Sequence, residues 1–137
     1  MRRIKRFIEN LVRIFQYLPL IWRDRDWDEQ FLLTLLEFKL RRMSNYFHKY
    51  GITVGNEEQA KQCKLAADLC KRMIDSEYWE HGIEWVQTGE EFLDGYFRRK
   101  PGFFFWESPM KYEDYMYEQD LYFLCRILKK YMRQWWD

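Results

Sequence analysis

The sequence contains few of the residues that build catalytic or metal centres. It has 2 histidines, His48 and His81, and 3 cysteines, Cys63, Cys70 and Cys125, without the Cys-x-x-Cys spacing of zinc knuckles. It also lacks a glycine-rich phosphate loop, a Gly-x-Ser-x-Gly elbow and a His-Glu-x-x-His motif. We therefore expect no enzyme activity, no catalytic residue, no metal and no cofactor. The odd number of cysteines argues against a disulfide framework and favours a reducing compartment.

Long apolar runs and an excess of one charge are also absent. No stretch approaches the roughly 20 uninterrupted apolar residues of a membrane-spanning helix, so we expect no transmembrane segment. Arg13 and Gln16 interrupt the apolar N-terminal stretch and no small-residue cleavage site follows, which argues against a signal peptide. The 23 Lys and Arg residues nearly balance the 22 Asp and Glu residues. No strong overall field draws the chain to nucleic acid or membrane, and any electrostatic partner must be met locally.

What the sequence does contain is apolar and aromatic. Hydrophobic residues make up 47% of the 137 residues, which predicts one globular domain over residues 1–137. Aromatic residues make up 20%, more than a core of this size easily hides, so we expect some rings at the surface. This surplus aromatic area also allows self-association.

Apolar residues at three- and four-residue spacing predict an amphipathic first helix from Arg2 to Leu18. Pro19 is expected to end this helix, leaving residues 20–26 as a connector. The apolar set is Ile4, Phe7, Ile8, Leu11, Ile14, Phe15 and Leu18. The opposite, basic face is a solvated surface or a contact for phosphates or an acidic partner.

Two further helices follow in the first half of the chain. One begins at Asp26 or Asp28 and runs to Tyr50, with Gly51 as a left-handed residue after it. The next runs from Asn56 to about Trp79, with Asn56 and Gln59 forming a capping box. Its small residues favour close packing against another helix. This apolar stripe is Ala60, Cys63, Ala67, Cys70 and Ile74.

The last helix is expected to start at Pro109, after Ser108 as its cap, and to reach the final residue. Its core stripe is predicted to be Tyr117, Leu121, Leu124, Leu128, Tyr131 and Trp135. Residues 80–105 carry several glycines and Pro101 among aromatic residues, which predicts irregular structure. The fold class is therefore all-α: a compact bundle of about four main helices with an irregular aromatic-rich segment before the last helix.

The densest local feature is the run WRDRDWD at residues 22–28. Tryptophan and arginine dominate interface hot spots, which makes Trp22, Arg23, Arg25 and Trp27 candidate partner-binding residues. The structural alternative is that an aspartate caps the next helix while the arginines pair with carboxylates. A calcium loop opening with Asp24, Asp26 and Asp28 is disfavoured, because Glu29 and Leu35 stand where glycine and glutamate are needed.

Two other aromatic segments are candidate binding surfaces. Arg98, Arg99, Phe104 and Trp106 belong to a basic run followed by an aromatic one, which can stack unpaired bases or bind a protein. At the C-terminus, Trp135 is expected to continue the core stripe. Trp136 either packs against the first helix or the Trp22 connector, or belongs to a docking surface.

Three stretches carry a resemblance: Ile21–Asp28 (IWRDRDWD), Lys39–Met43 (KLRRM) and Arg133–Asp137 (RQWWD). They resemble a group of uncharacterised small proteins from tailed bacteriophages, while the glycine-punctuated middle of the chain has no counterpart in that group. The resemblance implies a viral protein acting in the host cytoplasm.

We therefore expect a non-enzymatic accessory protein that binds a host or phage protein, with antagonism of a bacterial defence system as one form. The alternatives are a nucleic-acid-binding protein that uses the basic first helix, and a virion component.

Overall fold

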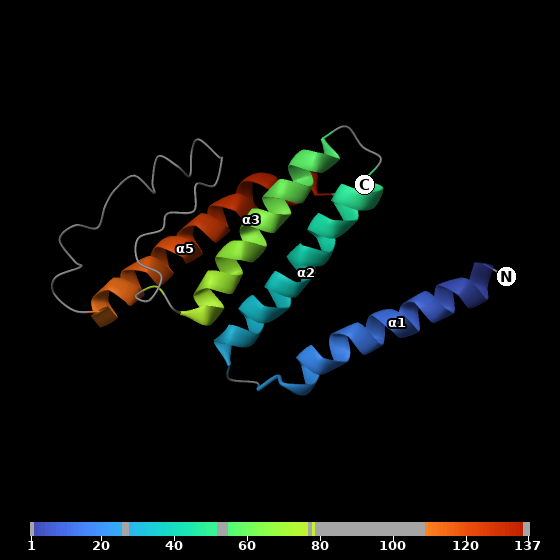
Figure 1. Cartoon of the computed structure of the whole chain (residues 1–137), viewed down its shortest axis with the longest axis horizontal. Helices are drawn as coiled ribbons and strands as arrows, with labels where there is room; N and C mark the ends of the chain where they lie inside the picture. The colour runs from blue at the N-terminus through green and yellow to red at the C-terminus, as the bar shows by residue number, and fades with distance from the viewer. Residues whose placement is uncertain (1, 26–27, 52–54, 77, 79–108, 136–137) are drawn as a thin grey trace.

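A computed structural model describes residues 2–25, 28–51, 55–76, 78 and 109–135 (Figure 1). The long helices of this part are α1 (Arg2–Trp22), α2 (Glu29–Tyr50), α3 (Asn56–Asp75) and α5 (Pro109–Tyr131), and the 3-10 turn η2 (Met132–Gln134) follows α5. No strand occurs among these residues, so the all-α prediction is confirmed. The irregular segment expected at residues 80–105 lies outside the described residues.

Helix α3 lies at the centre of the packed body, between α2 and α5 (Figure 1). Its small buried residues Cys63, Ala66, Ala67 and Cys70 let both neighbours approach closely. The larger core side chains come mainly from the two outer helices and from the turn after α5. They are Leu33, Leu40, Phe47, Phe123, Leu124, Ile127, Tyr131 and Trp135. The small-residue stripe predicted on the third helix is therefore the face on which the core is built.

Hydrogen bonds from the Asn56 side chain to the backbone hold the reversal between α2 and α3. Asn56 Nδ2 donates to the carbonyl oxygens of Phe47 at 3.2 Å and Gly51 at 2.8 Å. A β-carbon at Gly51 would collide with Asn56 and with the Phe47 carbonyl, so only glycine fits. Gly51 is extended, with φ −60° and ψ 128°, so the predicted left-handed conformation is wrong. The left-handed glycine is Gly55, with φ 98°, immediately before α3.

The capping box predicted at the start of the third helix is also wrong. Gly55 occupies the N-cap position without a side-chain cap, because the Asn56 amide is turned toward the end of α2. Gln59 Nε2 donates instead to the Gln134 carbonyl at 2.7 Å, and so connects α3 with η2. The helix ends at Asp75 rather than near Trp79, with Ser76 in the left-handed conformation at φ 51°.

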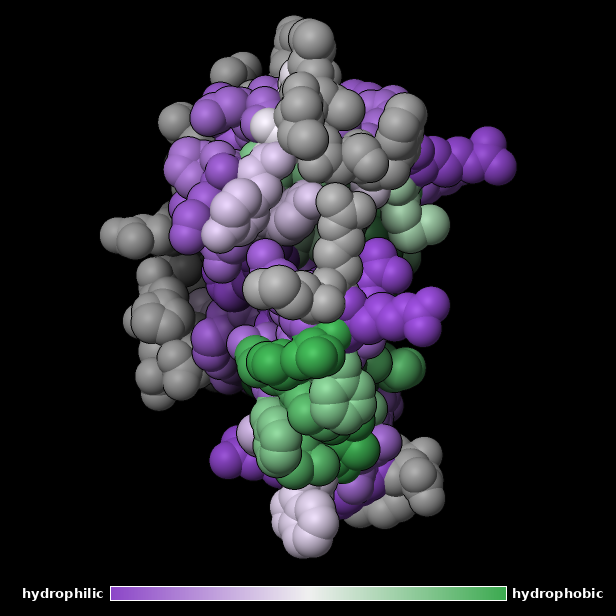
Figure 2. Space-filling model, turned by 90° about the vertical axis from the view of Figure 1, so that its right-hand side faces the viewer, coloured by the Kyte–Doolittle hydropathy of each residue, from purple (hydrophilic) through white to green (hydrophobic). Residues whose placement is uncertain are grey.

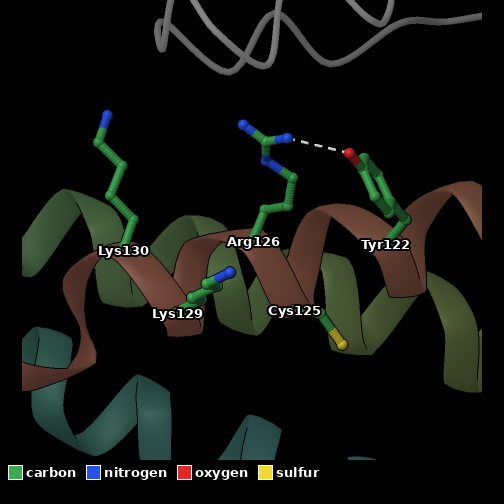
Figure 3. A pocket seen from close by; sticks show the side chains of 5 residues that line it. All are labelled: Tyr122, Cys125, Arg126, Lys129 and Lys130. Atoms are coloured by element: carbon green, nitrogen blue, oxygen red, sulfur yellow. Dashed lines mark hydrogen bonds between the residues drawn. The ribbon is translucent and has the colours of Figure 1, made fainter.

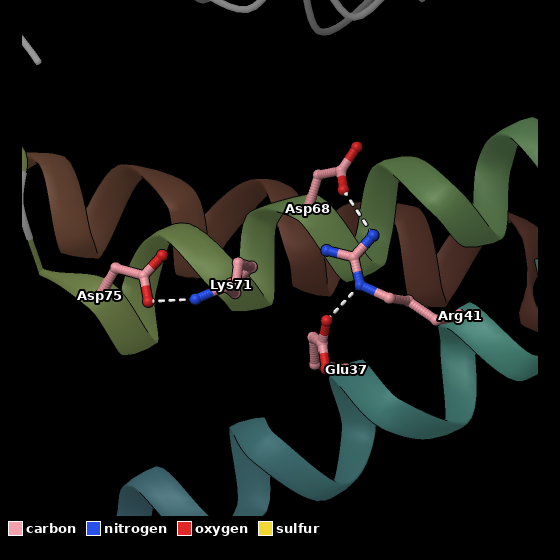
Figure 4. Close-up of polar contacts among 5 residues, drawn as sticks. All are labelled: Glu37, Arg41, Asp68, Lys71 and Asp75. Carbon is pink, nitrogen blue, oxygen red and sulfur yellow. Dashed lines mark hydrogen bonds and ion pairs between the residues drawn. The ribbon is translucent and has the colours of Figure 1, made fainter.

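A polar bridge on the surface also connects α2 with α3 (Figure 4). Arg41 pairs with Glu37 on its own helix, and its Nη1 lies 3.1 Å from Asp68 Oδ1 on α3. The Glu37 hydrogen bond and the nearby carboxylates raise the pKa of Arg41. Lys71 and Asp75 form a second pair along α3. Such exposed pairs contribute about 0.2–1 kcal/mol each, so the core dominates the stability.

Helix α1 continues four residues beyond the predicted end at Leu18, with Pro19 inside it. Proline removes one hydrogen bond, but the helix continues past it, and Tyr17 before it and Leu20 after it are partly buried. Backbone bonds from Arg23 N to the Leu20 carbonyl and from Asp24 N to the Ile21 carbonyl, both 3.1 Å, then close the helix.

Two predictions for the other helices need correction. Leu121 was expected in the core stripe of the last helix but is exposed, while Phe123 and Ile127 are buried. Leu32 of α2 is likewise an exposed leucine. The last helix ends at Tyr131, and η2 then turns the chain so that Trp135 enters the core.

Trp135 generates a test of this C-terminal turn. Its indole Nε1 donates to Gln62 Oε1 at 3.0 Å, and both side chains are buried. Trp135→Phe should lower the free energy of unfolding by about 1–3 kcal/mol, because the Gln62 oxygen loses its buried donor. Urea denaturation followed by circular dichroism measures this loss.

The double variant Gln62→Leu/Trp135→Phe is the matched control, since it removes the buried acceptor as well. It should be more stable than Trp135→Phe alone. Equal stability of the two variants would show that the hydrogen bond contributes nothing.

Candidate functional site

Helix α1 exposes its apolar side chains instead of burying them. Phe7 is 62% exposed, Phe15 67% and Trp22 85%. We call this surface the α1 apolar face. It consists of Ile4, Phe7, Ile8, Leu11, Val12, Ile14, Phe15, Leu18, Ile21 and Trp22. Figure 2 shows hydrophobic side chains gathered in one patch at the lower end of the molecule, next to hydrophilic ones. Exposed apolar patches of this kind mark interaction sites.

The side of α1 that meets the bundle carries polar and aromatic side chains. Arg42 of α2 donates to the Gln16 side chain, and its guanidinium carbon lies 5.7 Å from the Tyr17 ring centre and 5.6 Å from the Phe38 ring centre. The Tyr17 and Phe38 rings meet edge to face with their centres 5.0 Å apart. These cation–π and aromatic contacts are each worth about 0.5–1.5 kcal/mol. They hold α1 with its apolar face turned away from α2.

A cleft of about 270 Å³ lies between α1 and α2 on this polar side. Arg13 and Tyr17 line it from α1, and Lys39, Arg42 and Tyr46 are among the residues that line it from α2. Its three cations make it a local positive site. Arg42 is already engaged with Gln16 and the two rings, so the cleft first serves to join the helices.

Cations outnumber acids along α1. Arg3, Lys5, Arg6 and Arg13 are exposed, with Glu9 as the one acidic residue of the helix. At about 100° per residue Lys5, Arg6 and Arg13 fall outside the arc of the apolar face, and Arg3 lies at its edge, level with Ile21. Among the described residues, no helix combines the length and the apolar content required to cross a bilayer. The helix is therefore basic on one side and apolar on the other.

The WRDRDWD run is only partly described. Trp22 ends the α1 apolar face, and Arg23 and Arg25 are exposed beyond it. Asp28 Oδ1 accepts from Gln30 N at 3.0 Å and caps α2, which confirms the predicted capping aspartate. Among the described residues, no group of three or more His, Cys, Asp and Glu is arranged to hold a metal ion.

Several sequence-based candidates lie outside the described residues. They are Asp26, Trp27, His81, Arg98, Arg99, Phe104, Trp106 and Trp136. His48 lies exposed in the last turn of α2, with Nδ1 3.7 Å from Glu57 Oε1. Of the tryptophans proposed from the sequence, Trp22 is described, and it belongs to the α1 apolar face. No sequence motif predicted that this whole face is exposed.

A hollow of about 570 Å³ lies along α5 (Figure 3). Its described lining consists of Tyr122, Cys125, Arg126, Lys129 and Lys130, with Arg126 Nη1 donating to the Tyr122 hydroxyl at 3.0 Å. All five side chains are exposed and come from one helix. The hollow is positive, but these residues give it no fixed geometry for a particular ligand.

A buried polar cluster joins α3, the turn at Tyr78 and α5. The Tyr78 hydroxyl donates to Asp120 Oδ2 at 2.9 Å, and Arg72 Nε lies 3.0 Å from the same oxygen. Asp120 is fully buried and its Oδ1 accepts no hydrogen bond from the described residues. Burial raises the pKa of Asp120 to about 6, although Arg72 and the Tyr78 hydrogen bond oppose the rise. No sequence pattern predicts this cluster.

Two of the three cysteines are core residues. Cys63 and Cys70 are fully buried, and burial raises the pKa of both thiols to about 12. The thiolate is the nucleophilic form, so both residues act as small core side chains. Cys125 is exposed on α5. The burial of Cys63 and Cys70 agrees with their predicted place in the apolar stripe of the third helix.

Comparisons with protein-family models, with curated proteins and with solved structures find no match to this chain. The resemblance to small bacteriophage proteins therefore stays a prediction. The α1 apolar face is the candidate functional site on the geometry of the chain itself.

The Asp120 cluster predicts a pH dependence of stability. The folded state binds the Asp120 proton more tightly than the unfolded chain does. The contribution of Asp120 is therefore complete below about pH 4, the usual pKa of an aspartate, and is lost as the pH rises through about 6. The loss is on the order of 3 kcal/mol at about 1.4 kcal/mol per pH unit. Urea unfolding at a series of pH values measures it.

Asp120→Asn should flatten this part of the profile, because the amide does not titrate. Asp68→Asn is the control, since Asp68 is a partly exposed carboxylate in a surface ion pair. It should keep the slope of the unsubstituted protein. A slope that survives in Asp120→Asn would assign the effect to other groups.

Proposed function

We propose that this chain is a non-enzymatic binding protein that docks through the α1 apolar face. One observation carries the proposal: α1 contacts α2 through Gln16 and Tyr17, while the side chains of the α1 apolar face are exposed along the whole helix. Burying a large apolar side chain is worth about 1.5–3 kcal/mol. A face of this length therefore gains stability from a covering surface that the bundle does not supply.

The bundle supports this role by holding α1 in place. Arg42 fixes the polar side of the helix, and α2 is anchored in turn to the α3 core through Leu40 and Phe47. The described contacts of α1 with α2 are few and lie at Gln16 and Tyr17, so most of the helix is open to a docking surface.

The resemblance to bacteriophage proteins supports a host or phage component as the partner, in the host cytoplasm. In the sequence-based proposal this partner is a protein, and antagonism of a bacterial defence system is one form of its action. A virion component is an alternative. Nucleic acid binding is a weaker alternative, because the most exposed surface of α1 is apolar while Arg42 already contacts α1.

Photocrosslinking in bacterial cells tests the docking role. We expect Phe15→p-benzoylphenylalanine to form an adduct with another molecule, because Phe15 lies on the face that would be covered. Gel electrophoresis detects a protein adduct and mass spectrometry of the purified chain detects a lipid adduct.

Lys64→p-benzoylphenylalanine is the matched control, since Lys64 is exposed on α3. It should give no adduct above background. If the Phe15 position gives no more adduct than the Lys64 position, α1 is not a docking element and the proposed function fails.

A further inference from the structure

We propose that the surface on which the α1 apolar face docks is the anionic surface of a phospholipid bilayer. This inference rests on the proposed function and names its partner. Helix α1 would lie in the plane of the membrane, with its apolar face among the acyl chains and its polar side toward the bundle.

The width and length of the face fit this placement. At about 100° per residue its side chains cover about half of the helix circumference. At 1.5 Å per residue the 21 residues of α1 extend about 31 Å. A helix that is apolar along one half of its surface matches a helix immersed to its axis at a membrane interface. A coiled-coil contact with a second copy needs only a narrow stripe.

The chemistry of the face also favours lipid over a protein groove. Apart from the Trp22 indole, none of its side chains has a hydrogen-bonding group. Protein interfaces carry about one hydrogen bond per 100–200 Å², whereas acyl chains require none. Trp22 stands at the C-terminal end of the face and is 85% exposed. Tryptophan is enriched at the boundary between headgroups and acyl chains, where one edge of the ring stays in polar surroundings.

The charges on α1 indicate which membrane it prefers. Arg3 and Lys5 flank the apolar arc, and their long side chains can bury the methylene groups while the charged ends reach the headgroups. With Arg6 and Arg13 they give α1 a positive field against a single acid, Glu9. Anionic lipids attract such a segment, and two copies of the helix would repel each other. Near-neutral net charge of the whole chain, +1, leaves this attraction local to α1.

The contact with α2 is compatible with this orientation. Gln16 and Tyr17 contact Arg42 on the polar side, so lipid and bundle do not compete for the same side chains. Figure 1 shows α1 diverging from α2 toward its N-terminus. The helix can therefore enter a membrane interface without the core being opened.

Flotation with vesicles tests the inference on the full chain. We expect binding to vesicles of equal parts phosphatidylglycerol and phosphatidylethanolamine, and much weaker binding to phosphatidylcholine alone. Phe15→Asp should lower the partition coefficient by more than about tenfold. Arg6→Gln should lower it by about fivefold on the anionic vesicles only.

Met132→Asp is the matched control, since Met132 is 59% exposed on η2, outside α1. It should bind the anionic vesicles as the unsubstituted chain does. Circular dichroism and thermal unfolding should be the same for all three variants, because the substituted side chains are exposed. Arg6→Gln tests the inference even where Phe15→Asp alters the fold.

The outcomes separate this inference from the proposed function. Failure of the unsubstituted chain to float with anionic vesicles overturns the membrane inference. In that case a protein adduct at the Phe15 position keeps the docking role with a protein partner, and the absence of any adduct removes both. Equal binding to both vesicle types would overturn the electrostatic part. A dimer that Phe15→Asp dissociates, without vesicle binding, would assign the face to a second copy.

Discussion

The Arg42 guanidinium makes the contact that joins the first helix to the rest of the molecule. It donates to Gln16 and lies against the Tyr17 and Phe38 rings, so α1 is held by its polar side. The apolar side is then exposed by geometry, because the two sides of a helix cannot both face one neighbour. The exposed face, the cleft beside it and the proposed attachment all follow from this one contact. Docking and folding therefore use different side chains of the same helix.

Most of the helical fold could be predicted from local sequence. The apolar spacing located the four long helices, Asp28 was recognised as a cap, and Pro109 as a first helical residue. Helix ends were less predictable, because they depend on contacts distant in sequence. Asn56 turns away from its own helix to bind the end of α2, and Trp135 leaves the helical path to reach Gln62. Neither partner can be read from a local pattern.

Only part of the candidate site could be predicted from the sequence. Periodicity showed that α1 is amphipathic, but it does not show whether an apolar face meets its own core or another molecule. Sequence motifs indicated the basic side of α1 and the tryptophan–arginine run, and of that run Trp22 belongs to the exposed face. The burial of Asp120 could not be predicted for a similar reason, since its partners Arg72 and Tyr78 lie at distant positions in the sequence. A charged residue is recognised as buried only when its neighbours are known.

The reversal at Gly51 bears on the order in which the chain assembles. Its contacts join residues only a few positions apart, so α2 and α3 can close into a hairpin as soon as both have been synthesised. Helix α5 begins only at Pro109, long after α3 ends at Asp75, so a longer stretch of chain must be synthesised before α5 can cover the other side of α3. During translation the α2–α3 hairpin would thus form before α5 is available. Cys63 and Cys70 would be buried completely only after α5 has packed on α3.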